Sequence, residues 1–181
     1  MRSLVHAGLV AALVPIPDGW RHESFQFPLP FAKTIPYEGT EQVRFTPQWT
    51  HFAAPDAFSY AFVWDVKAKP VTADDLEDYL ETYFNGLMRN VGVARKLDDQ
   101  AVPAAAALHP MTAVRGWTDA YGAEVRTWNA FSKGEKLLLM GEITRRACPP
   151  DRMQIFFAMS KAPRDHAVWE RLRALRASTT C

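Results

Sequence analysis

The sequence predicts an α+β domain in which an antiparallel sheet of about six to seven strands is packed by two amphipathic helices. Three observations predict it: an aromatic strand over residues 58–66, helical apolar spacing over residues 72–91, and a series of strand-like segments after residue 111. The chain has 181 residues, of which 48% are hydrophobic and 12% aromatic. A single domain of this size buries a substantial core without help from a metal.

The N-terminal segment, residues 1–14, resembles a short signal peptide. Arg2 precedes an apolar run from Leu4 to Val14 that His6 interrupts, and small residues lie near Ala12. This pattern predicts export, with cleavage after Ala12. The alternative is an N-terminal strand or helix that packs on the single α+β domain formed by residues 15–181.

Residues 15–57 contain seven prolines, which exclude a continuous helix because proline lacks a backbone donor and fixes φ. Two short stretches between the prolines, residues 23–27 and 41–45, alternate polar and apolar side chains. We expect them to be edge strands, where proline nearby is tolerated.

Residues 58–66 form the strongest predicted strand, because five large apolar side chains share one parity and therefore one face: Phe58, Tyr60, Phe62, Trp64 and Val66. The helix that follows begins at a capping box of Thr72 and Asp75. Its apolar residues recur at helical spacing up to Val91, and Gly92 is expected to lie just beyond its end.

The C-terminal half predicts a four-strand antiparallel meander and a closing helix. Residues 93–110 are expected to be a loop whose alanine-rich part hides a short strand. The four strands predicted after it are Val114–Ala120, Glu124–Phe131, Lys136–Thr144 and Met153–Met159. Turns are expected at Tyr121–Gly122 and at Lys133–Gly134. The second helix is predicted over residues 164–177, with Pro163 in its first turn.

The order of these elements is strands, helix, four-strand meander, helix. It resembles the sandwich of the PsbP and Mog1 proteins, in which a long helix interrupts an antiparallel sheet and another helix closes the chain. The resemblance is one of element order, so it implies a fold and no activity.

The chain has two cysteines, Cys148 and Cys181. An even pair in an exported chain predicts a disulfide, whereas two unpaired thiols are the alternative. The two cysteines and the N-terminal segment together predict a periplasmic or secreted protein, with a cytoplasmic one as the alternative.

The composition excludes several classes of function. The formal net charge is +1, without the basic excess of a nucleic-acid binder, and no stretch has the length of a membrane span. The five histidines lack metal-ligand spacing, and no nucleotide-binding or hydrolase motif occurs. We therefore expect no metal and no cofactor, and a protein or small-molecule partner.

The candidate ligand site lies on the predicted meander. A two-residue turn at Tyr121–Gly122 would pair Trp117 with Arg126 and Arg115 with Trp128 across two strands. Arginine stacked on tryptophan binds planar or anionic ligands. The alternative is a solvated sheet face whose charges neutralise one another across the strands.

Three functions remain open from the sequence. The first is an exported, non-enzymatic binding or interaction domain of the bacterial envelope. The second is a small hydrolase whose site combines strand carboxylates with His51 or His109 and with Arg115 or Arg126. The third is a cytosolic ligand-binding domain, which requires that residues 1–14 join the core and that both thiols are free.

Overall fold

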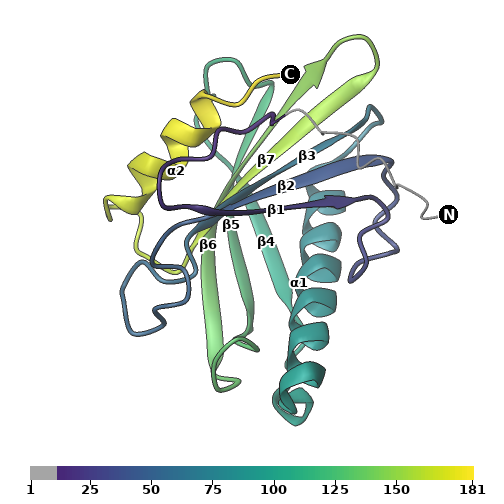
Figure 1. The fold of residues 1–181 in the computed structure, drawn as a ribbon. Helices are drawn as coiled ribbons and strands as arrows, with labels where there is room; N and C mark the ends of the chain where they lie inside the picture. The colour runs from purple at the N-terminus through teal and green to yellow at the C-terminus, as the bar shows by residue number, and fades with distance from the viewer. Residues whose placement is uncertain (1–11) are drawn as a thin grey trace, which may run out of the picture.

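The computed structural model describes residues 12–181 and confirms the predicted fold class. Within this part of the chain, one antiparallel sheet of seven strands is packed by two helices, and its strand order is β1-β2-β3-β7-β6-β5-β4 (Figure 1). The elements are β1 (Arg21–Gln26), β2 (Gly39–Phe45), β3 (Tyr60–Lys67), α1 (Ala73–Arg95), β4 (Ala105–Pro110), β5 (Asp119–Trp128), β6 (Lys136–Cys148), β7 (Arg152–Ser160) and α2 (Val168–Ala177), with a 3-10 turn at Asp98–Gln100.

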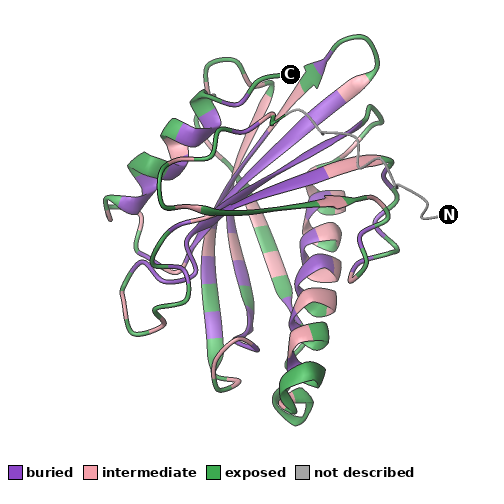
Figure 2. Ribbon diagram, viewed as in Figure 1, coloured by how far each residue is buried: buried purple, intermediate pink, exposed green. Residues whose placement is uncertain are grey.

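The sheet separates two hydrophobic cores, because α1 and α2 lie on its opposite faces (Figure 1). Strand β3 lies inside the sheet between β2 and the central strand β7, and it is buried on both faces from Tyr60 to Val66. Its aromatic face packs toward α1, as the alternation predicts. Its other face, with Ala61 and Val63, is covered by α2 rather than left to solvent. Figure 2 shows the central strands buried along most of their length.

Helix α1 begins as predicted and ends later. The capping box forms, with the Thr72 hydroxyl accepting from the Asp75 N–H at 3.1 Å and the Asp75 carboxylate accepting from the Thr72 N–H at 2.8 Å. Gly92 lies inside the helix, and Lys96 is the C-cap, with φ 58°. The glycine is required by packing: a Cβ at residue 92 would lie 2.3 Å from Cη2 of Trp128.

The C-terminal meander is present, but its first strand is not the predicted one. The alanine-rich segment forms β4 and pairs with β5, so that Ala106 lies opposite Val125. The predicted strand over residues 114–120 is wrong: residues 114–117 make a turn, in which the Trp117 N–H donates to the Val114 carbonyl at 3.0 Å, and β5 begins at Asp119.

The predicted turn at Tyr121–Gly122 is also wrong, because both residues lie within β5. Gly122 pairs with His109 of β4, and a Cβ at this position would lie 2.2 Å from the His109 Nε2. The glycine therefore makes room for a neighbouring ring and does not turn the chain.

Helix α2 is shorter at its start than predicted, beginning at Val168 instead of residue 164, and Pro163 precedes it outside the helix. Residues 164–167 make turns and a bend, and His166 Nδ1 accepts from the Val168 N–H at 3.1 Å. The inner face carries Val168, Leu172 and Leu175, all buried, as the spacing predicts. Neither helix described here is long and apolar enough to cross a membrane.

The two ends of the described chain meet on the α2 side of the sheet. The Thr180 N–H donates to the Leu13 carbonyl at 3.0 Å, and Val14 is buried in the core beneath α2. The predicted disulfide is confirmed, because Cys148 at the end of β6 is bonded to Cys181. The apolar stretch of residues 1–11, on which the signal-peptide prediction mainly depends, lies outside the described residues.

Candidate functional site

The four residues predicted to bind a ligand do not form one site. Arg115 is exposed in the turn before β5, and the Arg126 side chain is 67% exposed beside Glu124. Trp117 packs with the α2-side core, whereas Trp128 is buried in the α1-side core. The predicted cross-strand pairs are wrong, because Arg126 lies opposite Ala105 and Leu138, and no hairpin joins residues 117 and 126.

An arginine does stack on Trp117, but it is Arg146. The Arg146 guanidinium lies 4.4 Å from the Trp117 ring centroid and donates to Gln154 Oε1 and to the Thr179 carbonyl, both at 2.7 Å. Arg146 belongs to β6, and the turn before β5 brings Trp117 over it. Because Thr179 belongs to the C-terminal tail, the hydrogen bond from Arg146 ties the tail to β6.

The strand carboxylates considered for acid–base chemistry lie apart. In the sheet, Asp65 lies opposite Gln154 of β7, whereas Glu142 lies opposite Ala158, four residues further along the same strand. Asp65 forms an ion pair with Arg152 at 2.6 Å. The candidate histidines are also separate: His51 contacts Gln48 in the loop after β2, and His109 lies against Gly122 in the sheet. The predicted components of a hydrolase site are therefore not brought together.

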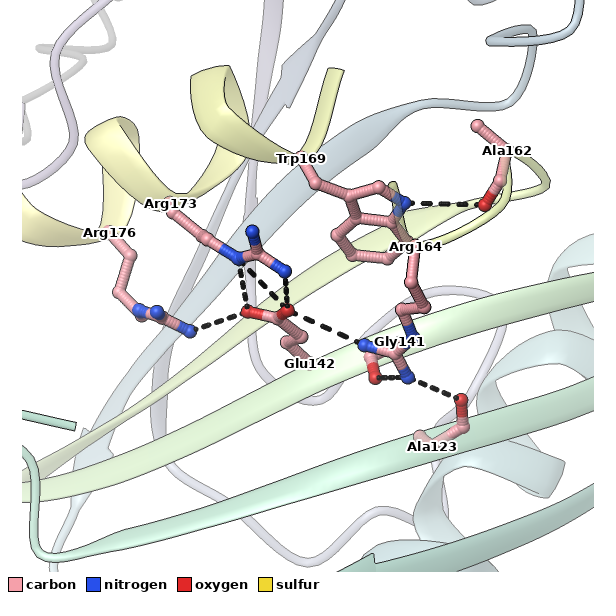
Figure 3. A network of polar contacts seen from close by, with 8 residues as sticks. All are labelled: Ala123, Gly141, Glu142, Ala162, Arg164, Trp169, Arg173 and Arg176. Carbon is pink, nitrogen blue, oxygen red and sulfur yellow. Dashed lines mark hydrogen bonds and ion pairs between the residues drawn. The ribbon is translucent and has the colours of Figure 1, made fainter. Parts of the chain in front are cut away.

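One buried carboxylate, Glu142, is surrounded by three arginines (Figure 3). Arg173 donates to its Oε1 at 2.6 Å, Arg176 donates to its Oε2 at 3.0 Å, and Arg164 lies 3.5 Å from Oε1. The Glu142 side chain is only 3% exposed and the Arg176 side chain 8%. These three arginines are therefore partners of a buried charge.

The electrostatics of this cluster explain how α2 is held. Burial raises the pKa of the Glu142 carboxyl, but the hydrogen bond and charge of Arg173 and the charge of Arg176 outweigh burial and lower this pKa below its usual value. Arg164 adds a hydrogen bond of 2.7 Å to the Gly141 carbonyl and stacks 4.9 Å from the centroid of Trp169 (Figure 3). The cluster thus ties α2 and the segment before it to β6, and its polar groups are occupied by one another.

A mostly apolar hollow lies on the other face, between α1 and strands β1, β2 and β3. It has a volume of about 220 Å³, and eight of its twelve lining residues are aromatic: Phe25, Phe31, Phe45, Trp49, Phe58, Tyr60, Tyr83 and Phe131. Leu87 and Val91 of α1 and Val43 of β2 complete the apolar wall. We call this hollow the aromatic pocket.

The walls of the aromatic pocket are packed against one another. Trp49 makes edge-to-face contacts with Phe131 and Phe58 at centroid distances of 5.1 and 5.7 Å, and Tyr83 stacks on Phe62 at 4.9 Å. Helix, strands and loops each supply part of the wall, so its shape is fixed by the tertiary fold. The Trp49 Nε1–H is buried and has no hydrogen-bond partner among residues 12–181.

Two carboxyl groups accompany the aromatic pocket. Glu23 on the edge strand β1 is the one charged residue in its lining. Glu41 lies behind the wall, where Tyr83 donates to its Oε1 at 3.2 Å and the Trp64 Nε1–H donates to its Oε2 at 2.6 Å. Burial raises the pKa of the Glu41 carboxyl to about 8, despite these two hydrogen bonds, so the carboxyl is largely neutral at pH 7.

A second hollow, of about 550 Å³, runs beside the C-terminal half of α1, but most of its lining side chains are exposed on the helix surface and in the following loop. Over the described part of the chain, no group of three or more histidine, cysteine, aspartate or glutamate residues is placed to hold a metal.

The aromatic pocket escaped sequence reasoning because its lining comes from separate loops and strands. The signal available was parity: Phe25, Val43 and Phe45 lie on the apolar face of two predicted strands. Glu41 shares that parity with Val43, which places a carboxylate on the core face of β2. A carboxylate on an otherwise apolar face is a local inconsistency of the kind that occurs at functional sites.

Comparisons of this chain with protein-family models, with curated proteins and with solved structures found no match.

Proposed function

We propose that this chain is an exported, non-enzymatic binding domain of the bacterial envelope and that the aromatic pocket is its ligand site. The observation that carries the proposal is a preformed hollow walled by eight aromatic side chains, with one charged residue in its lining. Small-molecule sites are concave and mostly apolar, with few polar groups that orient the ligand. At about 220 Å³ it suits a small ligand, or one end of a longer one.

Two further features support binding over catalysis. The charged side chains around Glu142 are already paired with one another. Neither His51 nor His109 contacts a carboxylate within the described residues. The Trp49 N–H, which has no hydrogen-bond partner in residues 12–181, and the Glu23 carboxylate belong to residues that line the aromatic pocket, and both are available to orient a ligand.

Export is supported by the disulfide between Cys148 and Cys181, because disulfides persist in oxidising compartments. The cytosolic alternative required two free thiols, and the bonded pair counts against it. The N-terminal apolar run remains the reason to expect a signal peptide.

Binding is tested with small apolar probes, toluene and 3,3-dimethylbutan-1-ol, titrated into the purified protein by calorimetry and by tryptophan fluorescence. We expect saturable binding that perturbs Trp49 and that Val91→Trp abolishes, because the larger side chain fills the hollow. Val93→Trp is the matched control, since Val93 is 56% exposed on the same helix. Failure of every small probe, neutral or cationic, to bind the folded native protein would refute the proposal.

Export is tested by the intact mass of the chain expressed with its own N-terminus in a secreting bacterium. We expect a mass lower by about a dozen residues, as the apolar run predicts. The mass of the denatured protein is expected to rise by two protons on reduction. A full-length mass in the cytosolic fraction would contradict export and leave the binding test unaffected.

A further inference from the structure

The aromatic pocket presents π faces together with negative charge. Eight aromatic side chains line it, and Glu23 is the one charged residue among its twelve lining residues. Aromatic faces carry negative electrostatic potential and attract cations, most strongly where water is excluded. A neutral apolar ligand would use the aromatic walls but would gain nothing from the Glu23 carboxylate.

The chain already places a cation on this aromatic surface. The Arg21 guanidinium lies 5.6 Å from the Trp49 ring centroid, within the range of a cation–π contact. Arg21 and Glu23 are two residues apart on β1, so their side chains share the face that turns toward the aromatic pocket. The edge of the pocket thus carries one cation stacked on an aromatic ring and one acidic group.

From this arrangement we propose that the aromatic pocket binds a small organic cation with apolar substituents, of the alkylammonium class, held by the aromatic faces and by the Glu23 carboxylate. This inference rests on the proposed binding function and names its ligand class. A quaternary ammonium head suits the walls, because it carries charge without N–H donors and the lining offers few acceptors for them. The Arg21 guanidinium competes for the same aromatic surface and opposes the incoming charge.

The test compares choline with 3,3-dimethylbutan-1-ol, its neutral carbon isostere, by calorimetry at pH 7. We expect choline to bind about tenfold more tightly, because the two molecules share a shape and differ in charge. Substitutions at two exposed residues of β1, Glu23 and Arg21, are expected to change choline affinity in opposite directions. Glu23→Gln is expected to weaken choline binding severalfold and to leave the isostere unchanged, whereas Arg21→Gln is expected to strengthen choline binding.

The outcomes separate this inference from the proposed function. Equal or tighter binding of the neutral isostere would refute the cationic ligand class and leave the proposed binding function standing. Binding of neither choline nor the isostere would refute both proposals. Choline binding that survives Val91→Trp, or that ignores both Glu23→Gln and Arg21→Gln, would also overturn the assignment. The two β1 variants keep the test decisive if Val91→Trp disturbs folding, since both replaced residues are exposed.

Discussion

Two buried glutamates on opposite faces of the same sheet have opposite chemistry. Glu142 is surrounded by arginines, which lower its pKa and keep it charged. Among the described residues, Glu41 has only the Trp64 indole and the Tyr83 hydroxyl as hydrogen-bond partners, so burial dominates and raises its pKa to about 8. A carboxylate buried without a cation takes up a proton because the charged form loses its hydration.

Glu41 is expected to make the folded protein less stable as pH rises from about 4.5 to about 8. In this window the folded state holds a proton that the unfolded state has released, so the free energy of unfolding falls by up to about 1.4 kcal/mol per pH unit. Glutamine cannot titrate, and the stability of Glu41→Gln relative to the native protein should therefore increase from pH 5 to pH 8. Urea unfolding at several pH values measures the difference, and parallel curves for the two proteins would contradict it.

At the scale of elements, the two helices are attached in different ways. Helix α1 packs along the sheet through the larger core and is ordered from its first turn by a local cap. Helix α2 has ten residues and lies on a smaller core, and the arginines in and before it converge on Glu142 of β6 (Figure 3). Loss of the Glu142 charge would leave the buried Arg176 without its counterion.

We expect Glu142→Gln to destabilise the fold by roughly 3–5 kcal/mol, because a buried ion pair that loses one partner leaves a desolvated charge behind. The matched control is Glu124→Gln, whose partner Arg126 is 67% exposed, and its cost is expected to stay below about 1 kcal/mol. Denaturant unfolding measures both variants. A small loss for Glu142→Gln would mean that the cluster does not hold α2.

The sequence predicts an element well where its signals are local. The capping box of α1 and the alternation in β3 depend on neighbouring residues, and both predictions are confirmed. Gly92 was predicted to end a helix and Gly122 to form a turn. Each instead makes room for an aromatic ring that is distant in the sequence, Trp128 for Gly92 and His109 for Gly122. The same reason hides the aromatic pocket, whose walls meet only after the sheet and α1 have assembled.

At the scale of the whole molecule, the disulfide joins the end of β6 to the last residue across a separation of 33 residues. We expect Cys148→Ser with Cys181→Ser to lower the free energy of unfolding by about 3–4 kcal/mol, since the unfolded chain gains the entropy of an open loop. The aromatic pocket lies on the other face of the sheet, so probe binding by the folded variant should be unchanged. Chemical unfolding and calorimetry measure the two effects, and a variant as stable as the native protein would contradict the first.

Leu13 and Thr180, near the two ends of the described chain, are neighbours joined by a hydrogen bond. Both lie on the α2 side, within one hydrogen bond of each other, while the aromatic pocket lies on the α1 side. A tag fused directly to Leu13 or to Cys181 would therefore join the domain on the α2 side, with the sheet between the tag and the aromatic pocket.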